Sequence, residues 1–213
     1  MTVEYEIEPT PGLPGVLPPG ETIVWQGSPD WQSLARVVFH TRLVAAWFVL
    51  VASLAFVSGG TGIKGAVITL IAAGLGLGVL YLLARASARS TIYTLTNRRI
   101  VMRFGVALPK CINLPLAAIG AADVRSLSAG HIDIVLNPTQ RFPLGWLQMW
   151  PHVQPWQVAS PRPMLRAVPE SFAPLLASAL ISADPSRAAP PAIETTPPAP
   201  RERALAPVTG VAA

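Results

Sequence analysis

The sequence is poor in cysteine and in charged residues. Its single cysteine, Cys111, excludes an intrachain disulfide and with it the framework of a small secreted disulfide-rich domain. Charged residues make up 13% of the chain, whereas soluble domains carry about a quarter. Hydrophobic residues reach 51% and the mean hydropathy is +0.46. This composition indicates that part of the chain lies in lipid. The acidic start also lacks the basic end and apolar run of a signal peptide.

Catalytic and metal-binding motifs are missing from the sequence as well. It has no glycine-rich phosphate loop, no paired carboxylates at a useful spacing and no nucleophile with a base. His131 and His152 have no cysteine or carboxylate at metal-ligand spacing, so both are expected to be structural or surface residues. Cys111 is most simply a small buried hydrophobe. We therefore expect no enzyme activity, no cofactor and no metal.

Two uncharged stretches are present, at Leu43–Val57 and Gly65–Ala84, with a glycine-rich break at 59–62. A helix needs about 20 apolar residues to cross a bilayer. The second stretch meets this length, and the first does so if it extends through Val37–Phe39 and Ser58. A buried hairpin in a soluble protein would keep a polar face, which neither stretch has. The sequence therefore predicts a two-helix transmembrane hairpin over residues 36–86.

Basic residues flank both stretches: Arg36, Arg42, Arg85 and Arg89. The break between the stretches offers only Lys64. By the positive-inside rule, this predicts a multi-pass protein of the bacterial inner membrane with both termini in the cytoplasm. The net charge of +5 is then partly a topology signal, and no nucleic-acid partner is expected.

Residues 87–183 alternate as β-strands do. Thr91–Thr96 and Arg99–Phe104 read as a hairpin with the turn Asn97-Arg98, one face apolar and the other mainly basic. Further strand candidates follow at Lys110–Leu114, Asp123–Leu127, His131–Leu136 and Arg141–Met149.

The end of this region shows helical spacing instead. Apolar residues recur at Leu165, Val168, Phe172, Leu175, Leu176 and Ala179. Pro169 suits a first helical turn, and Pro174 predicts a late start or a kink. Residues 184–213 are mostly Pro and Ala and predict a disordered tail. Residues 1–35 form an N-terminal Pro/Gly-rich segment, which is expected to be cytoplasmic.

The hairpin sequence resembles that of bacterial pleckstrin-homology-like (PH-like) membrane proteins. The shared stretch is Tyr93–Gly105, and the upstream Pro19–Glu21 and Trp25–Pro29 resemble the lead-in of that group. A narrower resemblance, to the photosynthetic complex assembly protein PuhB family, extends over about residues 12–182. It rests on Asn97–Pro109, Ile112–Pro115, Trp150–Val153 with Pro155-Trp156, and Pro163–Ala167.

This resemblance implies the fold class and the function. The fold is an α+β membrane protein, with a two-helix transmembrane hairpin followed by a PH-like antiparallel β-domain, a partly open barrel, and a C-terminal helix. The function is a membrane-bound assembly factor for the reaction centre–light-harvesting 1 core complex of purple bacteria, which binds and positions subunits. Expected partners are reaction-centre and light-harvesting 1 subunits, membrane lipids and a second copy in a homodimer. Two alternatives stay open: a generic membrane-tethered PH-like accessory protein, and a permanent structural subunit of the photosynthetic core.

Three groups of candidate site residues follow. Gly74, Gly76 and Gly78 lie in the second stretch, where GxxxG spacing allows close helix contact, either within the hairpin or with an oligomer or client helix. The basic residues are either a solvated face or a surface for anionic headgroups: Arg36, Arg42, Arg85, Arg89, Arg98, Arg99 and Arg103. The segment with Trp146, Trp150, His152 and Trp156 is either core or a docking surface.

His40 lies just before the first stretch, beside Arg42. In a photosynthetic setting it could ligate the magnesium of a bacteriochlorophyll. Its place at the wet edge of the membrane favours an ordinary interfacial histidine instead.

Overall fold

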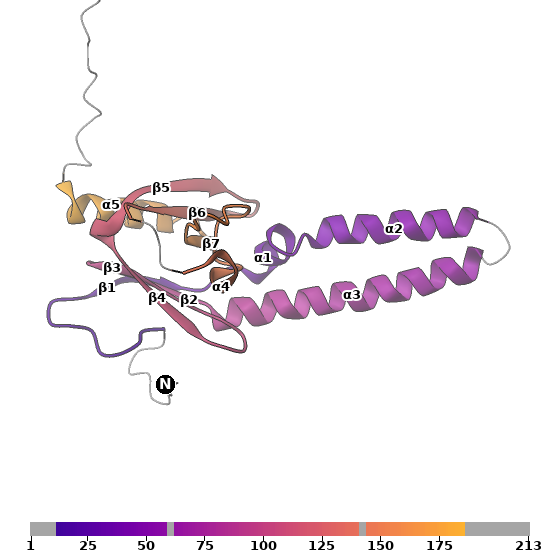
Figure 1. The fold of residues 1–213 in the computed structure, drawn as a ribbon, viewed down its shortest axis with the longest axis horizontal. Coiled ribbons are helices and arrows are strands. Elements are labelled where there is room, and N and C mark those ends of the chain that lie inside the picture. Colours follow the sequence, from indigo (N-terminus) through magenta and orange to yellow (C-terminus); the bar gives the residue numbers. More distant parts are fainter. Residues whose placement is uncertain (1–11, 59–61, 141–143, 186–213) are drawn as a thin grey trace, which may run out of the picture.

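A computed structural model describes residues 12–58, 62–140 and 144–185. The predicted disordered tail lies almost wholly outside these residues, as do residues 1–11 of the N-terminal segment and part of the glycine-rich break. In the described part, a β-domain stands at one end and two long helices project from it side by side (Figure 1).

The two projecting helices are α2, Thr41–Val57, and α3, Gly62–Ser90. Most of their large apolar side chains are exposed, such as Val57 and Leu75. α3 is long and apolar enough to cross a membrane, with a mean hydropathy of 2.4 over a window that is only 6% buried. A core helix of a soluble domain would be mostly buried, and this window of α3 is not.

α2 is too short by the same test. It reaches that length only together with the short helix α1, Trp31–Val37, from which it is bent by 53°. The break lies at His40, which has a left-handed backbone (φ 49°). Length and composition therefore establish one helix able to cross a membrane, and a second only if the bent pair acts as one span.

The first sheet combines residues from both sides of the helix pair. Its strand order is β1-β2-β3-β4, all antiparallel, with β1 at Ile23–Gly27, β2 at Ile92–Thr96, β3 at Arg99–Phe104 and β4 at Lys110–Pro115. The helix pair is thus an insertion between two paired strands. Residues 23–27, which the sequence placed in a separate N-terminal segment, belong to this sheet.

The second sheet has the order β5-β6-β7, with β5 at Ile119–Ser126, β6 at His131–Pro138 and β7 at Met164–Pro169. A 3₁₀ turn at Leu116–Ala118 connects the sheets. The helix α5, Phe172–Ala183, packs on the core that the sheets share, through Phe172 and Leu176. The hairpin 91–104 and the strands at 110–114, 123–127 and 131–136 are confirmed, the second of these starting earlier than predicted.

Two sequence predictions are wrong. Residues 164–169 form a strand, not the start of the final helix, and Pro169 ends it. Every residue of β7 from Met164 to Val168 is buried, so the alternation that marks a strand is lost. Pro174 lies in the first turn of α5, where a missing N–H costs nothing, so the predicted late start is confirmed.

The second error concerns Arg141–Met149. Residues 146–149 form a short helix, α4, rather than a strand. They do not pair with β6, which is already paired on one edge with β5 and on the other with β7. Residues 141–143 lie outside the described chain.

Candidate functional site

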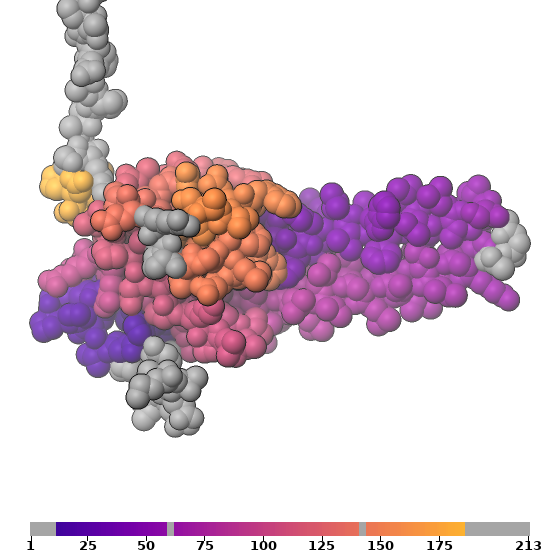
Figure 2. Space-filling model, viewed as in Figure 1, coloured from indigo at the N-terminus to yellow at the C-terminus, as the bar shows by residue number. Residues whose placement is uncertain are grey.

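A cleft lies at the junction between the helix pair and the β-domain. Its volume is about 400 Å³. One side comes from the α1–α2 break and the other from the segment between β6 and β7. The lining residues are Val37, Val38, His40, Arg125, Trp146, Trp150, Val153, Pro155, Trp156 and Arg166. Figure 2 shows the orange part of the chain, which contains this segment, against the base of the helices.

Backbone hydrogen bonds fix the segment between β6 and β7. Gln154 N donates to Arg162 O and Met164 N donates to His152 O, at 2.9 and 3.0 Å. The indole Nε1 of Trp146 donates to Gln154 O at 3.0 Å. Residues 146–163 therefore form an ordered surface rather than a loose loop.

The three tryptophans of this segment differ in burial. Trp146 is partly buried and packs on the core. Trp150 is 45% exposed and meets Phe39 edge-on at 5.7 Å between ring centroids. Trp156 is 93% exposed and has a left-handed backbone (φ 63°). Core packing therefore accounts for Trp146 but cannot account for Trp156, which leaves Trp150 and Trp156 as the candidate docking residues.

His152 does not belong to the docking surface, which corrects the prediction for that residue. It is 1% exposed and is not among the residues that line the cleft. Tyr93 Oη lies 2.6 Å from its Nδ1, and Thr91 Oγ1 lies 3.0 Å from its Nε2. Tyr93 Oη accepts from Arg166 N, and Thr91 Oγ1 donates to Ser87 O. These directions assign the Nε2–H tautomer, with Nδ1 accepting from Tyr93.

The result is a chain of hydrogen bonds from β7 to the end of α3. It runs from Arg166 through Tyr93, His152 and Thr91 to Ser87. Burial and the nearby charge of Arg166 lower the pKa of His152 to about 3, so the imidazole is neutral. Burial also raises the pKa of Tyr93 well above its ordinary value, so its hydroxyl keeps its proton. The network therefore couples the helix rigidly to the β-domain.

A buried ion pair supports the same segment from below. Arg166 NH1 donates to Asp133 Oδ2 at 3.1 Å, and the side chains are 6% and 1% exposed. The other guanidinium nitrogens donate to Pro151 O and Val153 O, at 3.1 and 3.0 Å. Asp133 Oδ1 accepts from Ala167 N at 2.8 Å. Because every partner is satisfied, the pair can hold the Trp-Pro-His segment against the sheet.

Sequence reasoning missed this pair. The strand His131–Leu136, which carries Asp133, was predicted, but Arg166 was not singled out, because residues 164–169 read as part of a helix. The one usable signal was a charged residue inside an apolar, fully buried run, which is rare unless the charge is paired.

The basic hairpin residues lie farther from the helices than predicted. In the β2–β3 register Arg103 faces Ile92, next to the end of α3, whereas the turn at Asn97-Arg98 lies at the opposite end of the hairpin. That end is about 16 Å away at 3.3 Å per residue. Figure 1 shows β2 and β3 leading away from the end of α3. Arg98 and Arg99 therefore lie well away from the domain end of α3, and their membrane-surface role stays a prediction.

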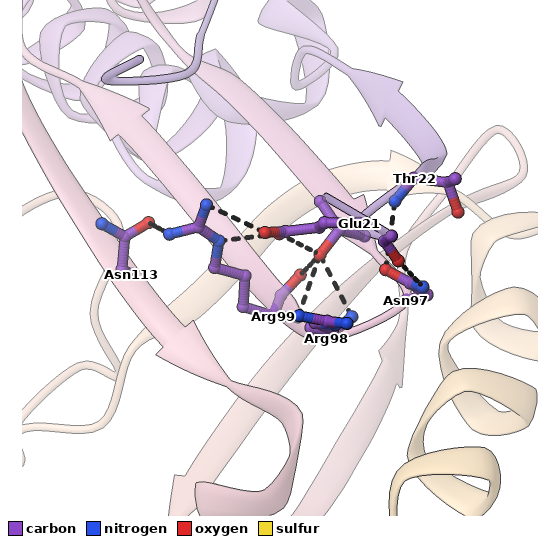
Figure 3. Close-up of polar contacts among 8 residues, drawn as sticks. Glu21, Thr22, Asn97, Arg98, Arg99 and Asn113 are labelled. Atoms are coloured by element: carbon purple, nitrogen blue, oxygen red, sulfur yellow. Dashed lines mark hydrogen bonds and ion pairs between the residues drawn. The ribbon is translucent and has the colours of Figure 1, made fainter. Parts of the chain in front are cut away.

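Arg99 instead forms an ion pair with Glu21 (Figure 3). Its Nε and NH2 donate to the two carboxylate oxygens at 2.8 and 3.1 Å, and Thr96 Oγ1 donates to Oε1 at 2.8 Å. Burial alone would raise the pKa of Glu21, but these hydrogen bonds and the charges of Arg99 and Arg98 outweigh it and hold the pKa low. Asn97 also clamps the lead-in, with Nδ2 donating to Gly20 O and Oδ1 accepting from Thr22 N. The Pro-Gly-Glu motif at 19–21 and the Asn-Arg-Arg motif at 97–99 thus contact each other directly.

The remaining basic residues cluster where the helices meet the domain. The guanidinium of Arg85 lies over the Trp31 ring at 5.6 Å, and Trp31 meets Tyr81 edge-on at 6.4 Å. Arg36 Nε donates to Gln32 O within α1. Arg42 and Arg89 lie near the domain ends of α2 and α3. The membrane-surface role of these residues and of Arg103 stays a prediction.

The three glycines of α3 do not share one environment. A Cβ on Gly76 would lie 4.0 Å from the ring of Phe48 in α2, whereas nothing lies within 4 Å at Gly74 or Gly78. The small side chains buried between the helices are Ala52 and Ala73. Gly76 thus faces α2, where a Cβ would make ordinary van der Waals contact, whereas the Gly74–Gly78 face is open in the described chain.

His40 lines the cleft and is exposed. Among the described residues, no group of three or more His, Cys, Asp or Glu side chains is placed to hold a metal ion. Ligation of a bacteriochlorophyll magnesium would need only one axial protein ligand, so the interfacial role of His40 stays a prediction.

Comparison with known proteins gives two matches and one absence. Residues 40–136 match the family described as Bacterial PH domain. The chain is 34% identical over 176 residues to an "Uncharacterized 23.7 kDa protein in puhA 5'region" of Rhodobacter capsulatus, which covers 79% of this chain and 82% of the relative. No solved structure matches. The chain therefore belongs to the PuhB family, that of the Rhodobacter capsulatus protein, and carries a bacterial PH domain.

Proposed function

We propose that α2 and α3 form a two-span hairpin in the bacterial inner membrane, with both termini in the cytoplasm. The support is the exposed apolar surface of both helices and the position of the basic residues. Arg36, Arg42, Arg85 and Arg89 all lie at the domain end, and Lys64 is the basic residue at the far end of α3. This asymmetry matches the positive-inside rule for a cytoplasmic β-domain. The α1–α2 pair then enters the membrane as one bent span.

The protein then acts as an assembly factor for the reaction centre–light-harvesting 1 core complex. The observation that carries this proposal is the cleft at the foot of the helix pair, with Trp150 and Trp156 exposed on its rim. A newly inserted client helix would leave the membrane at this level. Exposed aromatic side chains held on an ordered segment are typical anchors for a partner. The family, and a relative named for the puhA 5′ region, supply the photosynthetic context.

The mechanism is holding and positioning. The open Gly74–Gly78 face would contact a client or a second copy in lipid, and the cleft would hold the client's cytoplasmic end. The hydrogen-bond chain from Ser87 to Arg166 keeps the two surfaces in a fixed relation. Catalysis is not needed for this role, and we propose none.

Deletion and complementation test the proposal. Loss of the gene should lower the amount of reaction centre–light-harvesting 1 core while pigment synthesis continues. A W150A/W156A variant should insert and fold but fail to restore the core or to co-purify its subunits. The matched control is Ile181→Ala, an exposed apolar residue on α5 at the far end of the domain, which should restore both.

Two outcomes would redirect the proposal. Normal core levels in the deletion strain would reject assembly and favour a generic PH-like accessory protein. Stoichiometric presence of the protein in the purified mature core would favour a permanent structural subunit.

A further inference from the structure

The loop between β3 and β4 is apolar where a hairpin loop is normally polar. No charged or polar side chain occurs from Phe104 to Pro109, and basic residues, Arg103 and Lys110, stand on both sides. Val106 is 59% exposed and Leu108 is 75% exposed. Adjacent exposed apolar side chains in a turn are unfavourable in water, and they usually mark a surface that binds a partner or a membrane.

The backbone of the loop is built to present these side chains. Gly105 has φ +120°, and a Cβ there would clash with the carbonyl oxygen of Leu108. Phe104 faces Lys110 in the β3–β4 register, so the turn is tight. Phe104 itself is buried in the core, which leaves Val106 and Leu108 to project outward from the tip.

The position of the loop follows from strand direction. The uncharged part of α3 ends at Ala84, and the helix continues to Ser90, which adds about 9 Å. β2 leads away from that point and β3 returns, so that Arg103 faces Ile92. Two further residues carry the chain to Gly105, about 7 Å back toward the membrane side. The tip therefore reaches the level of Arg85–Arg89, and Figure 1 shows this hairpin beside the end of α3.

We propose that the Val106–Leu108 tip inserts into the interfacial layer of the membrane that holds the helices, as a peripheral anchor for the β-domain. The inference rests on the membrane anchoring proposed above. The occupant is the lipid surface, because the tip lies at its level and because an apolar tip with a basic collar complements acyl chains beneath anionic headgroups. The anchor would fix the tilt of the domain and hence the direction in which the cleft faces.

Depth-dependent fluorescence quenching tests this proposal. The full chain carries Cys111→Ser and one new cysteine, labelled with an environment-sensitive dye, in vesicles with or without lipid spin-labelled near the headgroup. Ala107→Cys places the dye on the exposed tip without removing Val106 or Leu108. Ile181→Cys places it on α5, at the other end of the domain, as a control. We expect several-fold stronger quenching at position 107 than at position 181.

A second background shows whether the protein or the dye drives insertion. With V106S/L108S, quenching at position 107 should fall toward the control. Equal quenching at both positions, or unchanged quenching in V106S/L108S, would overturn the proposal. A blue-shifted dye at position 107 that lipid spin labels do not quench would also overturn it, in favour of a protein contact.

Failure of the loop tip to insert can be distinguished from failure of the helices to anchor the protein in the membrane. Flotation of the labelled protein with vesicles after carbonate treatment reports on the helices alone. Protein that floats with an unquenched tip rejects the inference and leaves the proposed function standing. Protein that does not float rejects the membrane anchoring on which both rest.

Discussion

Arg166 is the single residue on which the contacts beneath the cleft converge. Its guanidinium joins Asp133 to two carbonyl groups of the Trp-Pro-His segment, and its amide starts the chain that passes through Tyr93 and His152. Each of these groups is buried, so no water replaces a lost partner. Among the residues around the cleft, Arg166 is therefore expected to be the most sensitive to substitution.

Substitution of Arg166 should be severe. Arg166→Met leaves Asp133 as an unpaired buried carboxylate and should cost about 3–5 kcal/mol of unfolding free energy. The midpoint of denaturation of the full chain in detergent measures this. Arg98→Ala, which removes an exposed cation, should change stability by about 0.5 kcal/mol or less. Equal midpoints for the two variants would contradict this account of the pair.

His152 predicts a pH dependence. Its folded pKa of about 3 lies below the ordinary 6.5, so the unfolded chain binds the extra proton between these values. Its contribution to stability is complete above about pH 6.5 and is lost as the pH falls, by up to about 1.4 kcal/mol per pH unit. Between pH 6.5 and 5 most carboxylates are still ionised, so the denaturation midpoint there reports mainly on histidine.

The His152→Gln variant provides the comparison for that pH series. It should be less stable than the parent at neutral pH, because Tyr93 and Thr91 lose a well-placed partner. It should also lose much of the slope between pH 6.5 and 5. A parent protein with a flat profile in this window, or a variant that keeps the full slope, would show that the imidazole is not held neutral.

At the scale of elements, α3 has two different faces. One face meets α2 through Ala73 and Gly76, and the other carries Gly74 and Gly78 without a neighbour among the described residues. The same run of small residues thus serves internal packing on one side and leaves a smooth surface on the other. Spacing along the sequence could not separate these roles, because it does not show where α2 lies.

Leucine substitutions distinguish the two faces of α3. G74L/G78L should leave the hairpin folded but weaken self-association or client co-purification, since close helix approach needs small residues. Gly76→Leu should instead disturb the hairpin, because its side chain would meet Phe48. Denaturation midpoints and co-purification, measured on both variants, separate the effects. Unchanged association in G74L/G78L would remove the contact role from this face.

For the whole molecule, the insertion of the helix pair between β1 and β2 is decisive. The first sheet closes only when residues before the helices pair with residues after them. Both ends of the pair must therefore return to the same place, which a hairpin does and a single span does not. The sheet is thus an independent structural argument that the chain crosses an even number of times or not at all.

Topology mapping gives the prediction at this scale. A cysteine at Ile63, exposed at the start of α3, should react with an impermeant thiol reagent from the periplasmic side in a C111S background. A cysteine at Ile181 should react only after the cells are opened. Reaction of both positions from the same side would contradict the two-span orientation.

The sequence by itself determined the features that depend on local composition. The apolar stretches, the hairpin at 91–104 and the family motifs can be read along the chain, because hydropathy, strand alternation and turn residues are local properties. Pro174 also predicted either a late start or a kink of α5, and the structure shows the late start.

Only the tertiary structure decided which distant residues meet. It joined Glu21 to Arg99 and Asp133 to Arg166, buried His152 while exposing Trp156, and moved Arg98 away from the helices. It also turned residues 164–169 into a strand, because β6 offered a free edge that outweighed the local helical spacing. Pairing, burial and orientation are relations between segments, and no single segment carries them.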